Sequence, residues 1–353
     1  MGSLYSSSTY LDDLDKAAAC SLKLDELRGS TILVTGAGGL LGSFLVDVLT
    51  RANEANALNC TVLATGRNLD KLKTRFAPCP FPGVTLGRWD ITEPPTFSHA
   101  VDFIVCAASN AHPAAFVSDP VGTVKANVSG LVHAFEYGLA HGMRRLLYVS
   151  SGEVYGTFSA DAPEAFIESK QGFVDPLSPR SAYPMSKRLA ETLCVSYIAQ
   201  READAVIVRP SHTYGPSATA NDSRANAQFV ADALVGRDIV MKSAGEQKRS
   251  YNYVADAISG LLSVLVCGEC GRAYNLANPN VCASIADFAA AVAAASGRRV
   301  VFSSPDKADD ALRSPIPNQV LSTTALESLG WKSAFDLETG IEHTIGIMGE
   351  THA

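Results

Sequence analysis

Short apolar and β-branched segments alternate with helical patterns along the first 210 residues of this 353-residue chain. Strands separated by helices at this interval are joined by right-handed crossovers and form a parallel sheet with helices on both faces. The segment 100–106 is apolar through most of its length, as a strand buried on both faces should be. The pattern therefore predicts an α/β fold with a doubly wound parallel sheet. The expected strands are 31–35, 60–65, 83–89, 100–106, 146–150 and 205–208, and the expected helices are 43–52, 70–76, 121–141 and 181–200.

A glycine-rich turn follows the first expected strand directly. Gly36, Gly39 and Gly42 stand at GxxGxxG spacing, with Leu40 and Leu41 inside the turn, and a helix follows. Glycine allows the tight turn and lets backbone N–H groups approach a pyrophosphate at the helix N-terminus. Strand, turn and helix together predict a Rossmann-type dinucleotide-binding site.

The end of the second strand bears on which nicotinamide cofactor is bound. An NAD site normally places an acidic residue there for the ribose hydroxyls, but no Asp or Glu occurs between Glu54 and Asp70. Arg67 follows the strand instead, and it could hold the 2′-phosphate of NADP, stack on adenine or lie in solvent. The positive charge of Arg67 and the missing acidic residue favour NADP, and the sequence leaves both NAD and NADP as candidate cofactors.

The alternation of strands and helices ends at Pro210, beyond which helices and short strands mix. We expect an N-terminal extension (1–29), a dinucleotide-binding domain (30–210) and a smaller, mainly substrate-binding C-terminal α/β domain (211–350). Some segments of the last part are expected to return to the first domain. The cleft between two such domains is the usual ligand site.

A tyrosine and a lysine four residues apart form the sharpest motif of the chain. Tyr183 and Lys187 share one face of a helix because they are at i and i+4. A neighbouring cation stabilises a phenolate, so we expect Lys187 to lower the pKa of Tyr183 and make it a general base. Ser151, at the end of the preceding strand, would bind and position the reacting oxygen.

Composition excludes several other classes of protein. The chain has 29 basic and 36 acidic residues, a net charge of −7, and no strongly basic run, which argues against a nucleic-acid partner. Its longest apolar stretches are shorter than the ~20 residues that cross a bilayer. The eight cysteines are scattered and suggest core residues in a reducing compartment. We expect a cytoplasmic protein without a metal site or a membrane partner.

Further motifs resemble those of the extended short-chain dehydrogenase/reductases, namely the nucleotide-sugar epimerases, dehydratases and decarboxylases. The segment 179–191, with its PRSAYPMSK run, is most similar to UDP-glucuronate decarboxylases. The other motifs are NVSG (127–130), VSSGEVYG (149–156), RPSHTYGP (209–216), RSYNYVAD (249–256), YNLAN (274–278) and LGW (329–331).

The resemblance implies a tightly bound NAD(P) that is recycled within each turnover, a UDP-sugar substrate and a homodimer. NAD is the cofactor that the family leads us to expect. Transient oxidation at C4 of the sugar would involve Tyr183, Lys187, Ser151 and Glu153. The implied cofactor-binding residues are Gly36, Gly39, Leu40, Leu41, Gly42, Arg67, Asp90, Ile91, Ala107, Ala108, Asn127, Tyr183, Lys187 and Pro210. The implied substrate-binding residues are Ser151, His212, Gln228, Arg249 and Tyr274.

Two departures from the family pattern, at Gly152 and His212, leave the reaction open. The decarboxylases usually carry a hydroxyl residue where this chain has Gly152, whereas Glu153 matches them. Epimerases tolerate a small residue there, and His212 stands where Asn is usual. A UDP-glucuronate decarboxylase-like reaction is slightly favoured over a UDP-sugar 4-epimerase. A net NAD(P)-dependent oxidoreductase acting on a non-nucleotide substrate, or a non-catalytic dinucleotide sensor, are further alternatives.

Overall fold

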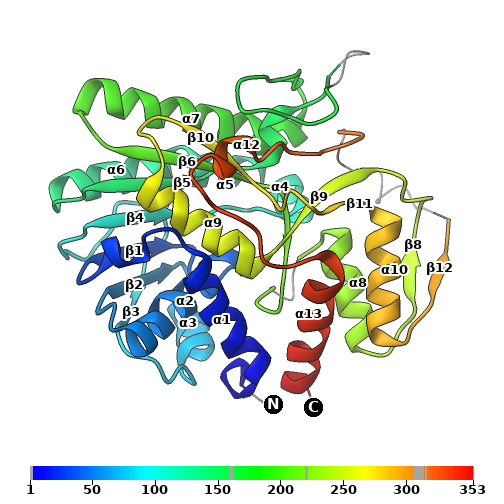
Figure 1. Ribbon diagram of the computed structural model, residues 1–353. Helices are drawn as coiled ribbons and strands as arrows, with labels where there is room; N and C mark the ends of the chain where they lie inside the picture. The colour runs from blue at the N-terminus through cyan, green and yellow to red at the C-terminus, as the bar shows by residue number, and fades with distance from the viewer. Residues whose placement is uncertain (1–2, 159–162, 219–221, 305–313, 315, 353) are drawn as a thin grey trace.

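The computed structural model describes residues 3–158, 163–218, 222–304, 314 and 316–352. At its centre is a seven-stranded sheet in the order β10-β6-β5-β4-β1-β2-β3 (Figure 1). All neighbouring strands in it are parallel, which confirms the predicted doubly wound α/β fold. The strands are β1 (Thr31–Thr35), β2 (Thr61–Gly66), β3 (Val84–Arg88), β4 (Phe103–Cys106), β5 (Arg145–Val149), β6 (Ala205–Pro210) and β10 (Ala273–Leu276).

Two apolar cores, one on each face, hold this sheet between helices. On one face Val34 and Val105 pack with α2 (Leu40–Asn56), α3 (Leu69–Phe76) and α9 (Val254–Cys267). On the other face Leu33 and Ile104 pack with α6 (Ser129–Ala140) and α7 (Ala182–Arg201). Side chains alternate in direction along a strand, so a strand that is apolar throughout supplies both cores.

The expected long helix at 121–141 is interrupted, so this prediction was wrong in detail. Helix α5 (Pro120–Asn127) ends before Val128 and α6 begins after it, with the shorter α4 (Pro113–Ser118) preceding both. Ser129 and Gly130 are weak helix formers, and they follow the interruption.

Most of the residues after Pro210 form a layer beside the carboxyl ends of the sheet, whereas α9 and β10 return to the central sheet and α12 (Thr324–Glu327) packs against β10. A three-stranded sheet contains β7 (His212–Tyr214), β9 (Lys248–Tyr253) and β11 (Cys282–Ser284), and a two-stranded sheet contains β8 (Ile239–Met241) and β12 (Val300–Phe302). The helices of this layer are α8 (Ala225–Leu234), α10 (Ile285–Ser296) and α13 (Leu337–His352).

The N-terminal helix α1 (Ser8–Cys20) packs against both parts of the molecule. It contacts α2, α9 and α13, and the two termini lie near each other (Figure 1). The Tyr10 hydroxyl donates to Asp47 on α2 at 2.5 Å, and Tyr253 on β9 donates to Asp13 at 2.5 Å. The extension thus ties the seven-stranded sheet layer to the C-terminal layer behind the cleft.

Short 3-10 helices occupy the remaining turns, and two of them flank the candidate site. They are η1 (Leu4–Ser6), η2 (Leu24–Leu27), η3 (Gly152–Tyr155) and η4 (Pro179–Ser181). Helix η3 follows β5 directly, and η4 leads into α7. Because β1, β4, β5 and β6 are parallel neighbours, their carboxyl ends lie at the same edge of the sheet. Open α/β sheets bind ligands at this edge.

Candidate active site

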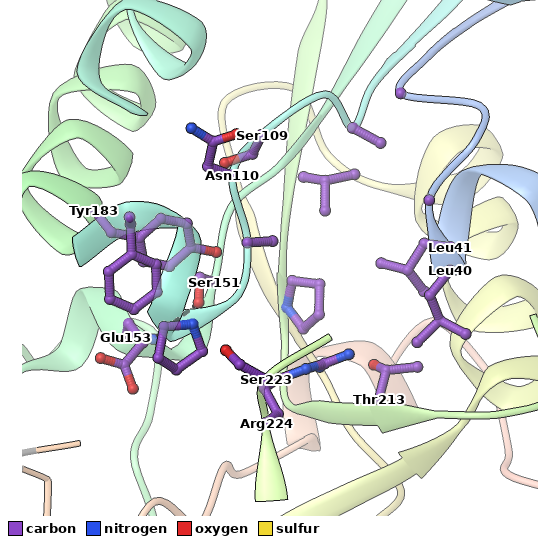
Figure 2. A pocket seen from close by; sticks show the side chains of 18 of the residues that line it. Leu40, Leu41, Ser109, Asn110, Ser151, Glu153, Tyr183, Thr213, Ser223 and Arg224 are labelled. Atoms are coloured by element: carbon purple, nitrogen blue, oxygen red, sulfur yellow. Dashed lines mark hydrogen bonds between the residues drawn. The ribbon is translucent and has the colours of Figure 1, made fainter. Parts of the chain in front are cut away.

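A single continuous cavity of about 1070 Å³ runs from the glycine turn to the C-terminal layer. Figure 2 shows Tyr183, Ser151 and Glu153 on one side of it and Leu40 and Leu41 on the opposite side. The predicted cofactor residues that line it are Gly36, Gly39, Leu40, Leu41, Gly42, Arg67, Asp90, Ile91, Ala107, Ala108, Tyr183, Lys187 and Pro210. The predicted catalytic or substrate residues that line it are Ser151, Glu153, His212, Gln228 and Arg249.

The glycine turn is built so that only glycine fits at two of its positions. Gly36 has φ of +69°, and a Cβ there would lie 2.8 Å from the Cα of Ala108. A Cβ on Gly42 would overlap the carbonyl oxygen of Gly36. The Thr35 hydroxyl accepts hydrogen bonds from the backbone N–H groups of Ala107 (3.0 Å) and Ala108 (3.1 Å), which joins the ends of β1 and β4. This close approach of backbone to backbone leaves an open cradle for a pyrophosphate at the start of α2.

Replacing Gly42 by Ala should therefore damage both the fold and the cradle. Overpacking of this kind typically costs about 1–3 kcal/mol of unfolding free energy, and the displaced turn should bind NAD(P) more weakly. Denaturant unfolding and a fluorescence titration with NAD(P) measure the two effects. Gly346→Ala on α13 is the control, because a Cβ there has no atom within 4 Å. Unchanged dinucleotide affinity in Gly42→Ala would contradict the assignment of the turn.

The cavity's far end beyond the glycine turn carries two cations. Arg67 is exposed just after β2, and Lys71 lies in the first turn of α3; both line the cavity. Asn68 between them accepts a hydrogen bond from the Lys71 N–H at 2.9 Å and caps the helix. Asp90 also lines this end, where its carboxylate accepts from the Thr92 N–H and hydroxyl.

Tyr183 and Ser151 lie together where η3 and α7 approach each other. The Tyr183 ring stacks on Phe116, with 4.9 Å between ring centroids and 14° between planes. Ser151 caps η3, since its hydroxyl accepts a hydrogen bond from the Glu153 N–H at 3.1 Å. The ammonium of Lys187 donates to the Val149 carbonyl at 2.7 Å and lies 5.8 Å from the Tyr183 ring centroid. One wall of the cavity thus contains Tyr183 and Lys187 from α7 and Ser151 from the end of β5.

The expected lowering of the Tyr183 pKa by Lys187 was wrong for this arrangement. Burial raises the pKa of Tyr183 to about 12, and the charge of Glu153 also raises it. Hydrogen bonding with Ser151 and the charge of Arg224 act in the opposite direction. Burial also lowers the pKa of Lys187 to about 8. The ammonium is directed at a backbone carbonyl, so it stabilises the phenolate less than i, i+4 spacing alone suggests.

Both oxygens of the Glu153 carboxylate are held. Arg180 approaches one oxygen at 3.3 Å, and Ser314 donates to the other at 3.0 Å. Arg180 and Ser314 were not predicted as site residues, although Arg180 stands inside the PRSAY motif. A cation and a hydroxyl on one carboxylate fix its orientation in the cavity wall.

Arg249 is buried, yet its guanidinium has no carboxylate partner among the residues that the structure describes. It donates to the carbonyl oxygens of Lys248 (2.8 Å), Pro317 (2.7 Å) and Ile316 (3.0 Å). Burial and the guanidinium charges of Arg249 and Arg224 lower the pKa of the half-buried His212 to about 3, so this imidazole is neutral. An unpaired buried cation favours an anionic ligand.

Two predicted site residues lie outside the cavity wall. Tyr274 is fully buried in β10, where its hydroxyl accepts from the Glu269 N–H at 2.9 Å. Asn127 is also buried, and its side-chain amide donates to the Ser186 hydroxyl at 2.9 Å. Neither residue lines the cavity, which corrects their predicted placement in its wall. The Asn127 side-chain oxygen has no hydrogen-bond partner in the described part of the chain, and its predicted role toward the cofactor stays a prediction.

The sequence reasoning also missed polar residues brought in from distant segments. Arg224, beside Ser223 at the start of α8, lies between Tyr183 and Leu40 in Figure 2 and pairs with Asp222. Gln319 comes from the segment before α12. A Cβ on Gly152 would lie 3.3 Å from the Gln319 amide, and the amide nitrogen has no partner in the described part of the chain. No local spacing signals such a residue.

Comparison with known proteins identifies the family. A model of the NAD dependent epimerase/dehydratase family matches residues 32–277. The chain belongs to this NAD dependent epimerase/dehydratase family. Its membership confirms the resemblance drawn from the motifs and makes the chain an enzyme of this kind.

Named relatives within the epimerase/dehydratase family cover most of the chain. UDP-glucuronic acid decarboxylase 1 of Xenopus tropicalis is 32% identical over 328 residues, which are 91% of this chain and 73% of that protein. UDP-glucuronic acid decarboxylase 5 of Arabidopsis thaliana is 32% identical over 312 residues, or 88% and 86% of the two chains.

Solved structures of similar fold are more distant in sequence. UDP-glucose 4-epimerase of Thermotoga maritima, crystallised with UDP-glucose, has a TM-score of 0.75 at 20% identity and covers 92% of this chain and all of its own. UDP-N-acetylglucosamine 4-epimerase of Methanobrevibacter ruminantium has a TM-score of 0.77 at 18% identity, with 92% and 99% covered. These likenesses support the fold.

Proposed function

We propose that this enzyme modifies a UDP-sugar through transient oxidation at C4 and acts as a UDP-glucuronate decarboxylase. One observation carries the proposal. The glycine cradle, the Ser151–Tyr183–Lys187 group, Glu153 and the unpaired Arg249 all line one cavity of about 1070 Å³. The relatives named UDP-glucuronic acid decarboxylase support the choice of substrate.

The cradle fits a nicotinamide dinucleotide. Gly36, Gly39 and Gly42 would hold its pyrophosphate at the start of α2, and Lys187 would lie near the nicotinamide half. When bound in its oxidised form, the cofactor would supply a positive ring and a reversible hydride acceptor for C4 of the sugar. Within this chain, the close backbone packing that only glycine permits at Gly36 and Gly42, beside the cavity that the turn lines, supports the assignment.

Tyr183 takes and returns the proton of the sugar 4-hydroxyl. Its pKa of about 12 keeps it protonated when the site is empty, and additional positive charge favours the phenolate. Ser151 hydrogen-bonds the same sugar oxygen, since it lies at the end of β5 beside the phenol. Stacking on Phe116 fixes the ring plane of Tyr183 and leaves the hydroxyl as its reactive edge.

Glu153 and Arg249 are charged groups of the cavity wall that can act on the anionic groups of UDP-glucuronate. Arg249 is a buried cation that can bind an anion of the substrate, either the diphosphate or the sugar carboxylate. Glu153, held by Arg180 and Ser314 in the cavity wall, would act as a base or as a charge that destabilises a neighbouring carboxylate. A 4-keto group beside C5 accepts the electrons that loss of carbon dioxide leaves behind.

A UDP-sugar 4-epimerase is the second candidate, and Gly152 favours it. The decarboxylases that this chain resembles usually have a hydroxyl residue there. In this structure a Cβ on Gly152 would lie 3.3 Å from Gln319, so the space is partly filled by another side chain. An epimerase needs no hydroxyl at this place.

Replacing Arg249 by Ala should weaken UDP binding. Charge-assisted hydrogen bonds contribute about 1.5–3 kcal/mol each, so we expect at least about a tenfold loss of affinity. Isothermal titration with UDP measures the effect. Arg299→Ala is the control, because Arg299 is exposed and pairs with Asp238 away from the cavity. Equal UDP affinity of wild type and Arg249→Ala would exclude a contact between Arg249 and the diphosphate.

Replacing Arg67 by Glu should change the cofactor preference. A carboxylate repels the 2′-phosphate of NADP and accepts from the ribose hydroxyls of NAD, so the ratio of NAD to NADP affinity should rise about tenfold or more. Titration of the cofactor-free protein with each dinucleotide measures it. Lys73→Glu, on the exposed side of α3, is the charge-matched control. A ratio that does not change would mean that Arg67 lies away from the ribose.

The substrate is tested by incubating the enzyme with UDP-glucuronate, UDP-glucose and UDP-N-acetylglucosamine and reading the products by NMR. The decarboxylase proposal requires a UDP-pentose and carbon dioxide from UDP-glucuronate. Conversion of UDP-glucose or UDP-N-acetylglucosamine into its 4-epimer, with UDP-glucuronate untouched, would establish the second candidate.

The homodimer and the compartment also belong to this proposal. Exposed apolar side chains follow α4, α5 and α7 on one surface, and a second copy of this chain would cover them; they are Val117, Val121, Val124, Met185, Leu189 and Val195. All eight cysteines lie in the described residues and are free thiols, which supports the cytoplasm. No helix in the described ranges is long and apolar enough to span a membrane.

A further inference from the structure

A buried ion pair lies directly behind the catalytic wall. Glu191, one helical turn after Lys187 on α7, binds Arg209 on β6 through both carboxylate oxygens, at 2.7 and 2.9 Å. The side chains are only 10% and 4% exposed. The proposed reaction does not use either residue.

The first link from this pair leads to Ser151. The Ser150 hydroxyl donates to the Glu191 carboxylate at 2.6 Å, and both residues are buried. Ser150 immediately precedes Ser151 at the end of β5. The carboxylate therefore fixes the backbone from which Ser151 projects.

The second link leads to the other end of η3. Arg209 donates to the Tyr155 hydroxyl at 3.0 Å, and Tyr155 in turn donates to the Asn275 side chain on β10 at 2.6 Å. Tyr155 is the last residue of η3, the short helix that carries Glu153. The segment from Ser150 to Tyr155 is thus held at both ends by one charge network.

The cost of burying two charges argues that the pair has a geometric role. Apolar residues of similar volume often stabilise a core as well as or better than a buried ion pair does. This pair also acts on Lys187, whose ammonium is surrounded by the Tyr148 and Tyr183 rings, Cys106 on β4, and Cys194 and Glu191 on its own helix. Among these groups Glu191 is the carboxylate, and its negative charge raises the pKa of Lys187 and so favours the ammonium form.

We propose that Glu191 and Arg209 are positioning residues that hold Ser151 and Glu153 on η3 in register with Tyr183 and Lys187 on α7. This inference rests on the proposed function, because it takes Ser151, Tyr183 and Lys187 as the catalytic groups. It assigns the pair a part in the rate of the reaction, distinct from binding of the substrate.

The decisive variant is Glu191→Gln, which keeps the shape and removes the charge. Small misplacements of catalytic groups can cost about a hundredfold, so kcat on UDP-glucuronate should fall about ten- to a hundredfold while KM changes less than about threefold. Loss of the carboxylate also removes a charge that favours the ammonium. The pKa of Lys187, already lowered to about 8, should fall by about one further unit. The ¹³Cε shift of labelled lysine reads this pKa without any turnover.

The matched control is Asp47→Asn, which breaks the buried pair of Asp47 with Arg75 on the far side of α2. It should lower thermal stability as Glu191→Gln does, while kcat and the Lys187 pKa stay at wild-type values. A loss of kcat equal to that of Glu191→Gln in this control would mean general destabilisation and overturn the proposal.

Tyr155→Phe is a second variant that keeps every charge and decides the question if Glu191→Gln does not fold. It should reduce kcat with the Lys187 pKa unchanged. The proposal is overturned if both foldable variants keep kcat within about twofold of wild type while Tyr183→Phe is inactive. Activity of Tyr183→Phe would instead overturn the proposed function, and the Lys187 titration would still decide the effect of Glu191.

Discussion

Replacing Tyr183 by Phe should abolish turnover of UDP-glucuronate and leave the fold intact. Phenylalanine keeps the stacking on Phe116 at 4.9 Å and loses only the hydroxyl that moves the proton. General acid–base catalysis contributes about 10²- to 10⁴-fold to a rate, so we expect a loss of that size. NMR of the products measures turnover, and thermal unfolding checks the fold.

Tyr137→Phe is the matched control for Tyr183→Phe. Its hydroxyl donates to the His99 carbonyl at 2.9 Å, away from the cavity, so the variant should keep wild-type turnover. If Tyr183→Phe retains more than about a tenth of the wild-type rate, another group moves the proton.

Replacing Glu153 by Gln should separate the two candidate reactions. Glutamine has nearly the same volume and can still accept from Ser314, but it removes the charge opposite Arg180. In a decarboxylase that uses this carboxylate, kcat should fall about a hundredfold or more. Product NMR with UDP-glucuronate, at matched dinucleotide occupancy, gives the rate.

The control for Glu153→Gln is Glu136→Gln. Glu136 is exposed on α6 and pairs with Arg201, so the same change of charge there should leave the rate unaltered. If Glu153→Gln still decarboxylates UDP-glucuronate at the wild-type rate, Glu153 has no catalytic role in that reaction. A Glu153→Gln enzyme that converts UDP-glucose into its 4-epimer at the wild-type rate, in a protein that Tyr183→Phe inactivates, would favour the 4-epimerase.

Local patterns were enough to predict the sheet and the cradle. The apolar run Thr31–Thr35 and the glycine spacing after it specify a strand and a tight turn through backbone geometry alone, and both appear as β1 and the start of α2. Tyr183 and Lys187 share a helical face for the same local reason. The seven-stranded sheet also takes in β10, which the alternation of the first 210 residues does not reach.

Groups that depend on distant contacts were not predicted. Ser314 and Arg180 meet at Glu153 from positions 161 and 27 residues away along the chain. Spacing in the sequence carries no signal of such a meeting. Tyr274 was expected at the substrate because its motif matches the family, but its position in β10 buries it. The pKa of Tyr183 likewise depends on burial, which a motif does not report.

Transient oxidation at C4 is the central claim, and deuterium at that carbon tests it most directly. UDP-glucuronate deuterated at C4 should react more slowly than the unlabelled sugar, because the C4–D bond is broken, and should give a UDP-pentose that still carries the deuterium at C4, with no accumulation of reduced cofactor, as read by NMR and absorbance. Transfer of the deuterium to a stoichiometric amount of released NADH or NADPH would contradict the account and indicate a net oxidoreductase.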